Sequence, residues 1–332
     1  MKKIMSIFLI SIFIMLVVGC SNTKKRADSE LNLKMDIAEN FNGKHQEYYA
    51  SNGQKKWEGN FKNGKLNGLF TVWRENGLRI FERNYKDDNQ DGQAIVWYES
   101  GQKKSESNFK NGKQEGITTT WYENGQKQFE GNFKDGKQDG LTTVWYGNGQ
   151  KKLEGHFKNG NDEGVSLIEW YENGQKKIET NFKNQKKDGL TTIWFENGQK
   201  HTEENYKEDK LHGLFSEWHK SGLKKIERNF KNDEHDGLTT EWFENGQKKF
   251  EGNFKDGKQD GLTTIWNKDG QKISEINYKD GKQDGSFIEY FENGNKKFER
   301  NFKDDNLHGL TTEWLKNGKV KFEGNYIEGI RK

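Results

Sequence analysis

The chain has 332 residues, of which 55 are basic and 52 acidic, so its formal net charge is only +3. A nucleic-acid-binding surface needs a strong basic excess, so this balance argues against a nucleic-acid partner. Hydrophobic residues make up 30% of the chain, a fraction that alone would suggest disorder, but aromatic residues reach 13% and recur at fixed spacing. Large rings bury the most area per residue, so this aromatic periodicity indicates a folded chain.

Residues 1–20 have the organisation of a targeting segment. A short basic start precedes an apolar run over residues 4–18, which is too short to span a bilayer comfortably. The run ends at Cys20, the only cysteine of the chain, in a context that resembles the lipobox of bacterial lipoproteins. The sequence therefore predicts an N-terminal signal helix, lipidation of Cys20, and a membrane-anchored protein of the bacterial cell envelope, at the outer membrane or the cell surface.

The rest of the chain is organised by a repeat. Residues 21–43 are polar and lack a sustained period, which predicts a flexible tether. Residues 44–67 form a degenerate copy, predicted to cap the array, and residues 68–332 hold eleven copies of a 24-residue unit. One copy carries an extra residue. Each full copy opens with a glycine: Gly68, Gly92, Gly116, Gly140, Gly164, Gly189, Gly213, Gly237, Gly261, Gly285 and Gly309.

We number the positions of the unit from 0 at its opening glycine. Positions 1–6, Leu-Thr-Thr-Val/Ile-Trp-Tyr/Phe in the most regular copies, and positions 10–17 are rich in strand-forming residues. Asn-Gly at positions 8 and 9 predicts a tight hairpin loop, and Lys-Asp-Gly-Lys-Gln-Asp at positions 18–23 predicts a wider turn. The unit is thus a β-hairpin. The predicted fold is all-β, an elongated, twisted antiparallel meander of stacked hairpins.

The register of the hairpin decides which side chains share a face, and two registers fit the sequence. A two-residue loop would place position 13 opposite position 4, on the face away from the tryptophan of position 5. A three-residue loop with a left-handed glycine and a bulge would place position 13 opposite position 3, on the tryptophan face. We favour the second register because it gathers the Leu of position 1, the Trp of position 5 and the Phe of positions 13 and 17 on one face.

The aromatic stripes have two interpretations. They can form the core that stacked units share, because one unit cannot bury itself. They can also form an exposed aromatic groove with Lys and Glu at its rims, suited to a peptide, a glycan or a lipid headgroup. The candidate binding residues are the aromatic side chains of positions 5 and 6 in the central copies: Trp121, Trp145, Trp170, Trp194, Trp218, Trp242, Tyr122, Tyr146, Tyr171 and Phe195.

The unit Trp-Tyr-Glu-Asn-Gly-Gln-Lys-Lys-x-Glu-Gly-Asn-Phe-Lys-Asp-Gly-Lys-x-Asp-Gly resembles the MORN repeat, in the bacterial variant found in YwqK-like antitoxin proteins. The resemblance covers residues from about 44 to 332. It implies stacked β-hairpins and a role in protein scaffolding or lipid-headgroup contact. The antitoxin label would imply neutralisation of a partner toxin, although such roles are usually cytoplasmic and the lipobox departs from that setting.

Nothing in the sequence points to a reaction. The seven histidines are scattered, no Cys/His cluster has metal-ligand spacing, and the repeats leave no stretch for a phosphate-binding glycine loop. We therefore expect no catalytic residue, no metal and no cofactor. The predicted function is a non-catalytic binding or adhesion scaffold whose ligand is a protein, glycan or lipid. The alternatives are an immunity or antitoxin-like protein that neutralises a partner toxin, and a dedicated lipid-headgroup or glycan binder.

Overall fold

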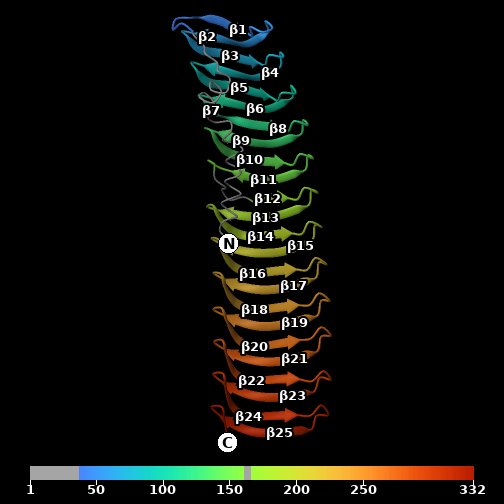
Figure 1. The fold of residues 1–332 in the computed structure, drawn as a ribbon. Helices are drawn as coiled ribbons and strands as arrows, with labels where there is room; N and C mark the ends of the chain where they lie inside the picture. The colour runs from blue at the N-terminus through green and yellow to red at the C-terminus, as the bar shows by residue number, and fades with distance from the viewer. Residues whose placement is uncertain (1–36, 161–165) are drawn as a thin grey trace. The chain divides into compact units, whose positions relative to one another are not determined.

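The computed structural model describes residues 37–160 and 166–332 (Figure 1). These residues form 26 strands and no helix, and consecutive strands pair antiparallel as hairpins, so the predicted all-β meander is confirmed. Within the same residues there is accordingly no helix with the length and apolar character that crossing a membrane requires. The predicted signal helix of residues 1–20, Cys20 and most of the polar tether lie outside the described residues.

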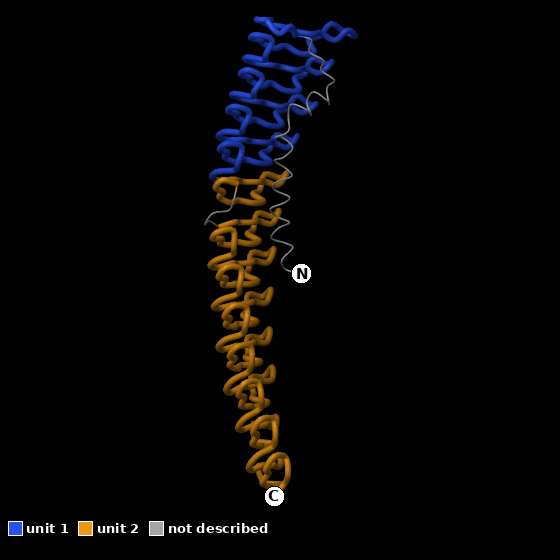
Figure 2. Tube along the Cα trace, turned by 90° about the vertical axis from the view of Figure 1, so that its left-hand side faces the viewer, with its two compact units in different colours: residues 1–140 blue, residues 141–332 orange. Residues whose placement is uncertain are grey.

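The chain divides into two compact units, residues 1–140 and 141–332 (Figure 2). The strand β10 (Lys137–Trp145) contains the boundary between them. Unit 1 otherwise holds β1 (Gly43–Tyr48), β2 (Lys55–Lys62), β3 (Lys65–Trp73), β4 (Arg79–Lys86), β5 (Asn89–Trp97), β6 (Lys103–Lys110), β7 (Lys113–Gln114), β8 (Gly116–Trp121) and β9 (Lys127–Lys134).

Unit 2 repeats the same hairpin with few interruptions. Its strands are β11 (Lys151–Phe157), β12 (Ser166–Trp170), β13 (Lys176–Lys183), β14 (Lys186–Trp194), β15 (Lys200–Lys207), β16 (Lys210–Trp218), β17 (Lys224–Lys231), β18 (Glu234–Trp242), β19 (Lys248–Lys255), β20 (Lys258–Trp266), β21 (Lys272–Lys279), β22 (Lys282–Tyr290), β23 (Lys296–Lys303), β24 (Asn306–Trp314), β25 (Val320–Ile327) and β26 (Ile330–Arg331). The copy that opens at Gly237 illustrates the geometry.

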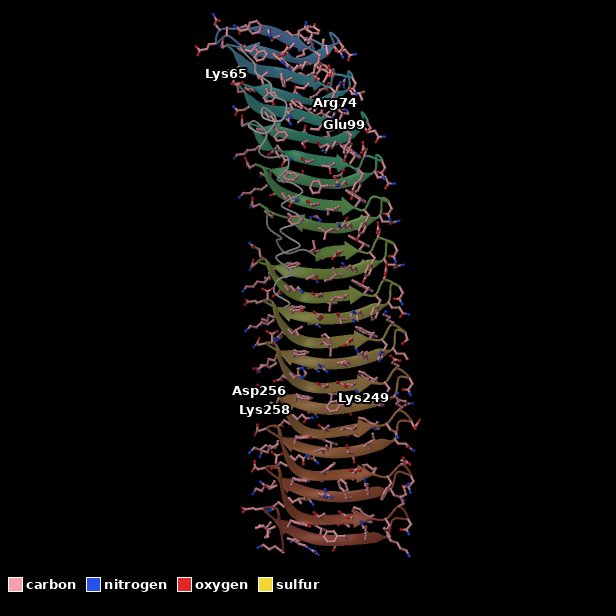
Figure 3. All side chains as sticks on the ribbon, viewed as in Figure 1. Lys65, Arg74, Glu99, Lys249, Asp256 and Lys258 are labelled. Carbon is pink, nitrogen blue, oxygen red and sulfur yellow. The ribbon has the colours of Figure 1, made fainter. Side chains whose placement is uncertain are left out.

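The tightest turn of the unit lies at positions 18–21. Lys255 pairs with Lys258, so the loop holds only Asp256 and Gly257, whose φ angles are +47° and +78°. Two consecutive left-handed residues are the mark of a type I′ hairpin turn, for which Asp-Gly is a preferred pair. The prediction of a wider turn here was therefore wrong. Figure 3 shows Asp256 and Lys258 at one end of the strands and Lys249 nearer to the other end.

The Asn-Gly segment forms the wider loop instead. The N–H of Phe243 donates to the carbonyl of Gln247 at 2.9 Å, which leaves three residues in the loop. Gly246 has a φ of +83°, and the side-chain oxygen of Asn245 accepts the N–H of Gln247 at 3.1 Å. A three-residue loop with a left-handed glycine is the loop that we favoured, so this part of the prediction is confirmed.

The favoured register is nevertheless wrong, because a second irregularity follows the loop. Trp242 lies opposite Lys248, but Glu241 lies opposite Phe250, so Lys249 is an extra, bulged residue. The same skip recurs in other copies, for example between Val72 and Trp73. One extra residue moves the rest of the strand to the other face. Position 13 therefore lies opposite position 4, and the Phe of positions 13 and 17 point away from the Trp of position 5.

Each repeat thus has two faces. The phenylalanine face carries positions 2, 4, 13, 15, 17 and 22, and the tryptophan face carries positions 1, 3, 5, 11, 14 and 16. In unit 1 the buried core lies on the phenylalanine face: Trp57, Phe61, Leu66, Phe70, Val72 and Phe81. Phe41 and Ile37 pack against it. The core is therefore built from one aromatic stripe, and the position-5 tryptophans form no part of it.

The opening glycine is required by the backbone. Gly237 has a φ of +115°, which side chains with a Cβ rarely adopt. A Cβ there would also lie 3.2 Å from the Cβ of Asn229, whose amide donates to the carbonyl of Leu238 at 3.2 Å. The same asparagine contact recurs over Gly213 and Gly309. The left-handed backbone and the close asparagine side chain explain why a glycine opens the described copies.

Candidate binding face

The tryptophans of position 5 are half-buried and form a ladder with cations from the preceding repeat. The ammonium of Lys200 lies 5.7 Å from the ring centroid of Trp218, and that of Lys248 lies 5.7 Å from Trp266. The same contact covers Trp121, Trp170, Trp194 and Trp242 at 5.5–5.9 Å. Cations at this distance are attracted by the negative face of the ring. The ladder is therefore covered by lysine.

Each covering lysine is itself neutralised. Lys200 pairs with Glu203, Lys224 pairs with Glu227 at 2.6 Å, and the same lysine–glutamate pair recurs at positions 11 and 14 of seven other copies, whereas Val320 holds position 11 of the last copy. The lysine–glutamate pairs alternate with the tryptophans along the face. In one copy Tyr290 replaces the tryptophan, and burial and the neighbouring Glu275 raise its pKa to about 12. The candidate tryptophans thus belong to a charge-balanced surface.

The aromatic residues of position 6 connect one repeat to the next. The hydroxyl of Tyr146 donates to the carbonyl of Trp170, and that of Tyr171 donates to the carbonyl of Trp194, both at 2.9 Å. Tyr98 and Tyr49 make the same bond in unit 1. The lysine of position 12 lies over these rings, as Lys177 does over Tyr171 at 5.9 Å.

The remaining candidates occupy equivalent places in their own copies. Tyr122 and Trp145 are half-buried at positions 6 and 5. Phe195 has no hydroxyl to reach its neighbour, and its ring packs against that of His201, with centroids 4.3 Å apart. The structure therefore places all ten candidate residues on regular positions of the repeat, the tryptophans at position 5 and the other rings at position 6.

The sequence predicts position 1 in the core, but the structure exposes its apolar side chains. The leucines of this position lie on the tryptophan face with 40–48% of their surface exposed in unit 2: Leu141, Leu190, Leu214, Leu238, Leu262 and Leu310. Leu69 and Ile117 occupy the position in unit 1. From Leu190 to Leu262 the leucines occur in successive copies, two strands apart, so their spacing is roughly 10 Å, and Ser286 interrupts the series before Leu310. We call this feature the leucine stripe.

A family model for the MORN repeat variant matches nine segments, which together cover more than half of the chain. They are residues 90–111, 114–135, 138–159, 166–184, 187–208, 236–256, 259–280, 283–304 and 307–328. The chain belongs to the MORN repeat variant family. The resemblance of the sequence unit to this repeat is therefore confirmed, and MORN repeats are generally binding or scaffold repeats. No curated protein matches this MORN repeat chain significantly.

Solved structures that resemble this MORN repeat chain include a complex named TcdB2-TccC3-Cdc42, with 10% identity and a TM-score of 0.20, and TcdB2-TccC3, with 9% and 0.18. The Tc holotoxin pore of Photorhabdus luminescens matches with 10% identity and a TM-score of 0.17. The matches cover 86%, 86% and 87% of this chain but only 18%, 19% and 18% of those chains. Scores this low carry no functional argument.

The chemistry of the described MORN repeats is that of surface contacts. Among residues 37–160 and 166–332, no group of three or more His, Cys, Asp or Glu side chains is arranged to hold a metal ion. The aspartates of the turns cap backbone groups of the neighbouring repeat, as Asp260 does for the N–H of Asp280 at 3.2 Å. The face therefore offers apolar, aromatic and charge-paired contacts at regular intervals.

Proposed function

We propose that this protein is a non-catalytic binding scaffold of the bacterial cell envelope, anchored by a lipid at Cys20, and that its leucine stripe contacts a protein partner. The observation that carries the proposal is the recurrence of a half-exposed leucine at one position of successive repeats. On the same face, a tryptophan lies four residues further along the strand from each leucine, as Trp218 does from Leu214 and Trp242 from Leu238. Such regular apolar exposure is typical of surfaces that a partner covers.

The charge pattern supports a protein partner over the other ligands that we considered. The lysines of the tryptophan face are paired with glutamates, and the whole chain has a formal charge of +3. An anionic membrane surface attracts clustered unpaired basic residues, and a polyanion does the same. A charge-neutral face with leucine and tryptophan matches the composition of a protein interface, whose centre is depleted in charge.

The stripe can be tested with two matched variants of the full chain. The stripe variant replaces Leu190, Leu214, Leu238 and Leu262 with glutamine. The turn variant replaces Lys207, Lys231, Lys255 and Lys279, which are exposed at the type I′ turns, with glutamine. Each immobilised protein is incubated with an extract of the cell envelope, and every captured component is quantified.

We expect components that bind the original chain and the turn variant but are lost from the stripe variant. Variants with two leucines replaced should retain an intermediate fraction, because repeated contacts add in a graded way. Equal capture by all the proteins would overturn the assignment of the stripe. Capture of a single tight partner that is toxic to cells lacking this protein would instead favour the immunity function.

The anchor has its own test. We expect the full chain to fractionate with membranes and to incorporate a labelled fatty acid, and the Cys20→Ser variant to do neither. Because a single acyl chain gives only weak membrane binding, the incorporated label is the more direct test of lipidation. Labelling that persists in the Cys20→Ser variant would contradict the proposed attachment point.

A further inference from the structure

Three copies of unit 2 lack the usual aromatic residue at position 6, where they carry His219, Asn267 and Leu315, and the first of these has a further distinction. A cavity of about 420 Å³ lies there, within the size range of small-molecule sites. It is lined on one side by His219, Lys225 and Ile226, and on the other by Trp242 and Phe243 of the next repeat. Its lining includes the paired residues Ile226 and Glu241 of the phenylalanine face, and no leucine of the leucine stripe.

Copies with a tyrosine at position 6 show what is missing from this cavity. At the equivalent place the hydroxyl of Tyr171 donates to the carbonyl of Trp194 at 2.9 Å, and Lys177 lies over the ring at 5.9 Å. The His219 ring is smaller, and no corresponding bond to the carbonyl of Trp242 is formed among the described residues. Lys225 and the carbonyl of Trp242 correspond to the groups that contact Tyr171. Both are present around His219, but a phenol ring is not.

The histidine itself has an unsatisfied polar atom. Its Nε2 is buried and has no hydrogen-bond partner among the described residues, and its Nδ1 lies 3.8 Å from Oε1 of Glu244, beyond a normal hydrogen bond. A buried nitrogen without a partner costs free energy that a ligand can recover. Lys225 is held near the cavity by its 2.7 Å ion pair with Glu217.

We propose that this cavity is a binding site for a phenolic ring. The ring takes the place of the absent tyrosine, with Lys225 above its face and Trp242 and Phe243 beside it. Its hydroxyl donates to the carbonyl of Trp242 and lies within reach of the His219 imidazole. The site is lined by neighbouring repeats and contains no residue of the leucine stripe, so it is independent of that surface and does not rest on the proposed function.

The probe is p-cresol, the side chain of tyrosine, and the comparison ligand is toluene, which lacks the hydroxyl. Binding to the full chain is followed by saturation-transfer NMR and by calorimetric titration. We expect p-cresol to bind at about millimolar concentration, as its few heavy atoms allow, and toluene to bind about tenfold more weakly. Equal binding of the two ligands would overturn the assignment of the hydroxyl contact.

Two variants locate the site. In His219→Tyr the protein supplies the phenol itself, so p-cresol binding should fall at least about tenfold while the thermal midpoint stays the same or rises. Adding Tyr171→His to that variant opens the equivalent place two copies earlier, next to Lys177 and Trp194, and should restore p-cresol binding. The proposal fails if His219→Tyr binds p-cresol like the original chain, or if the double variant, folded by circular dichroism, does not regain it.

Discussion

The ammonium of Lys224 lies 5.9 Å from the ring centroid of Trp242, one repeat further along the chain. The contact is inter-repeat, so it stabilises the stacking of hairpins. An exposed cation–π contact of this kind is worth about 0.5–1 kcal/mol. We expect Lys224→Met to lower the free energy of unfolding by roughly that amount, measured by urea denaturation. Lys224→Arg should restore most of it, and a loss of equal size in the arginine variant would refute the contribution of the ring.

The bulged residue of position 12 has no opposite residue on the preceding strand, so its deletion should be far less harmful than deletion of a paired residue. Without Lys249, Lys248 stays opposite Trp242 and Phe250 stays opposite Glu241, so both faces are kept. Deleting Glu251 instead would move Phe254 from opposite Gly237 to opposite Leu238, on the tryptophan face, and would expose a ring that is now half-buried. We expect the Glu251 deletion to cost about 2 kcal/mol or more, the scale of burying a large side chain. The Lys249 deletion should cost well under half as much. Thermal unfolding of both variants checks the comparison.

Two buried threonines at position 2 should respond to the same substitution with opposite signs. The Thr263 hydroxyl accepts a hydrogen bond from the amide of Gln259 at 3.3 Å. The Thr191 hydroxyl is buried without a partner among the described residues, because position 22 holds Lys187 in that copy. An unsatisfied buried hydroxyl costs about 1–3 kcal/mol.

We therefore expect Thr191→Val to raise the urea midpoint and Thr263→Val to lower it, each by an amount that corresponds to about 1 kcal/mol. The two sites have nearly the same burial and the same strand geometry, so each serves as the control for the other. A decrease at both sites would show that the Thr191 hydroxyl has a partner in solution.

His235 gives the structure a dependence on pH. Its ring packs edge-on against Phe230 and Phe254, with centroids 4.6 Å and 5.4 Å away. Burial, and secondarily the charge of Arg228, hold its pKa below the ordinary value of 6.5. The neutral imidazole is therefore favoured in the folded state. Its stabilisation is complete above pH 6.5 and is lost as the pH falls through the folded-state pKa.

The corresponding variant is His235→Gln, since glutamine occupies this position in the next copy. We expect the urea midpoint of the original chain to fall between pH 7.5 and pH 5, and the variant to show a smaller decrease over that range. Parallel curves for the two proteins would mean that other groups cause the dependence.

The sequence alone determined the repeat, the hairpin unit and the fold class. The 24-residue period, with strand-forming residues between Asn-Gly and Asp-Gly segments, predicts stacked hairpins. Each unit must stack on the next to bury its rings. The identity of the family followed from the same unit.

Only the tertiary structure decided the faces. The residue type does not reveal the bulge at Lys249, because lysine occupies both the paired position, Lys248, and the bulged position, Lys249. Because the side-chain period of a strand is two, this single residue separates Phe250 from Trp242 and moves Leu238 from the predicted core to the surface. The leucine stripe follows from that separation, which is why the sequence predicted these leucines in the core.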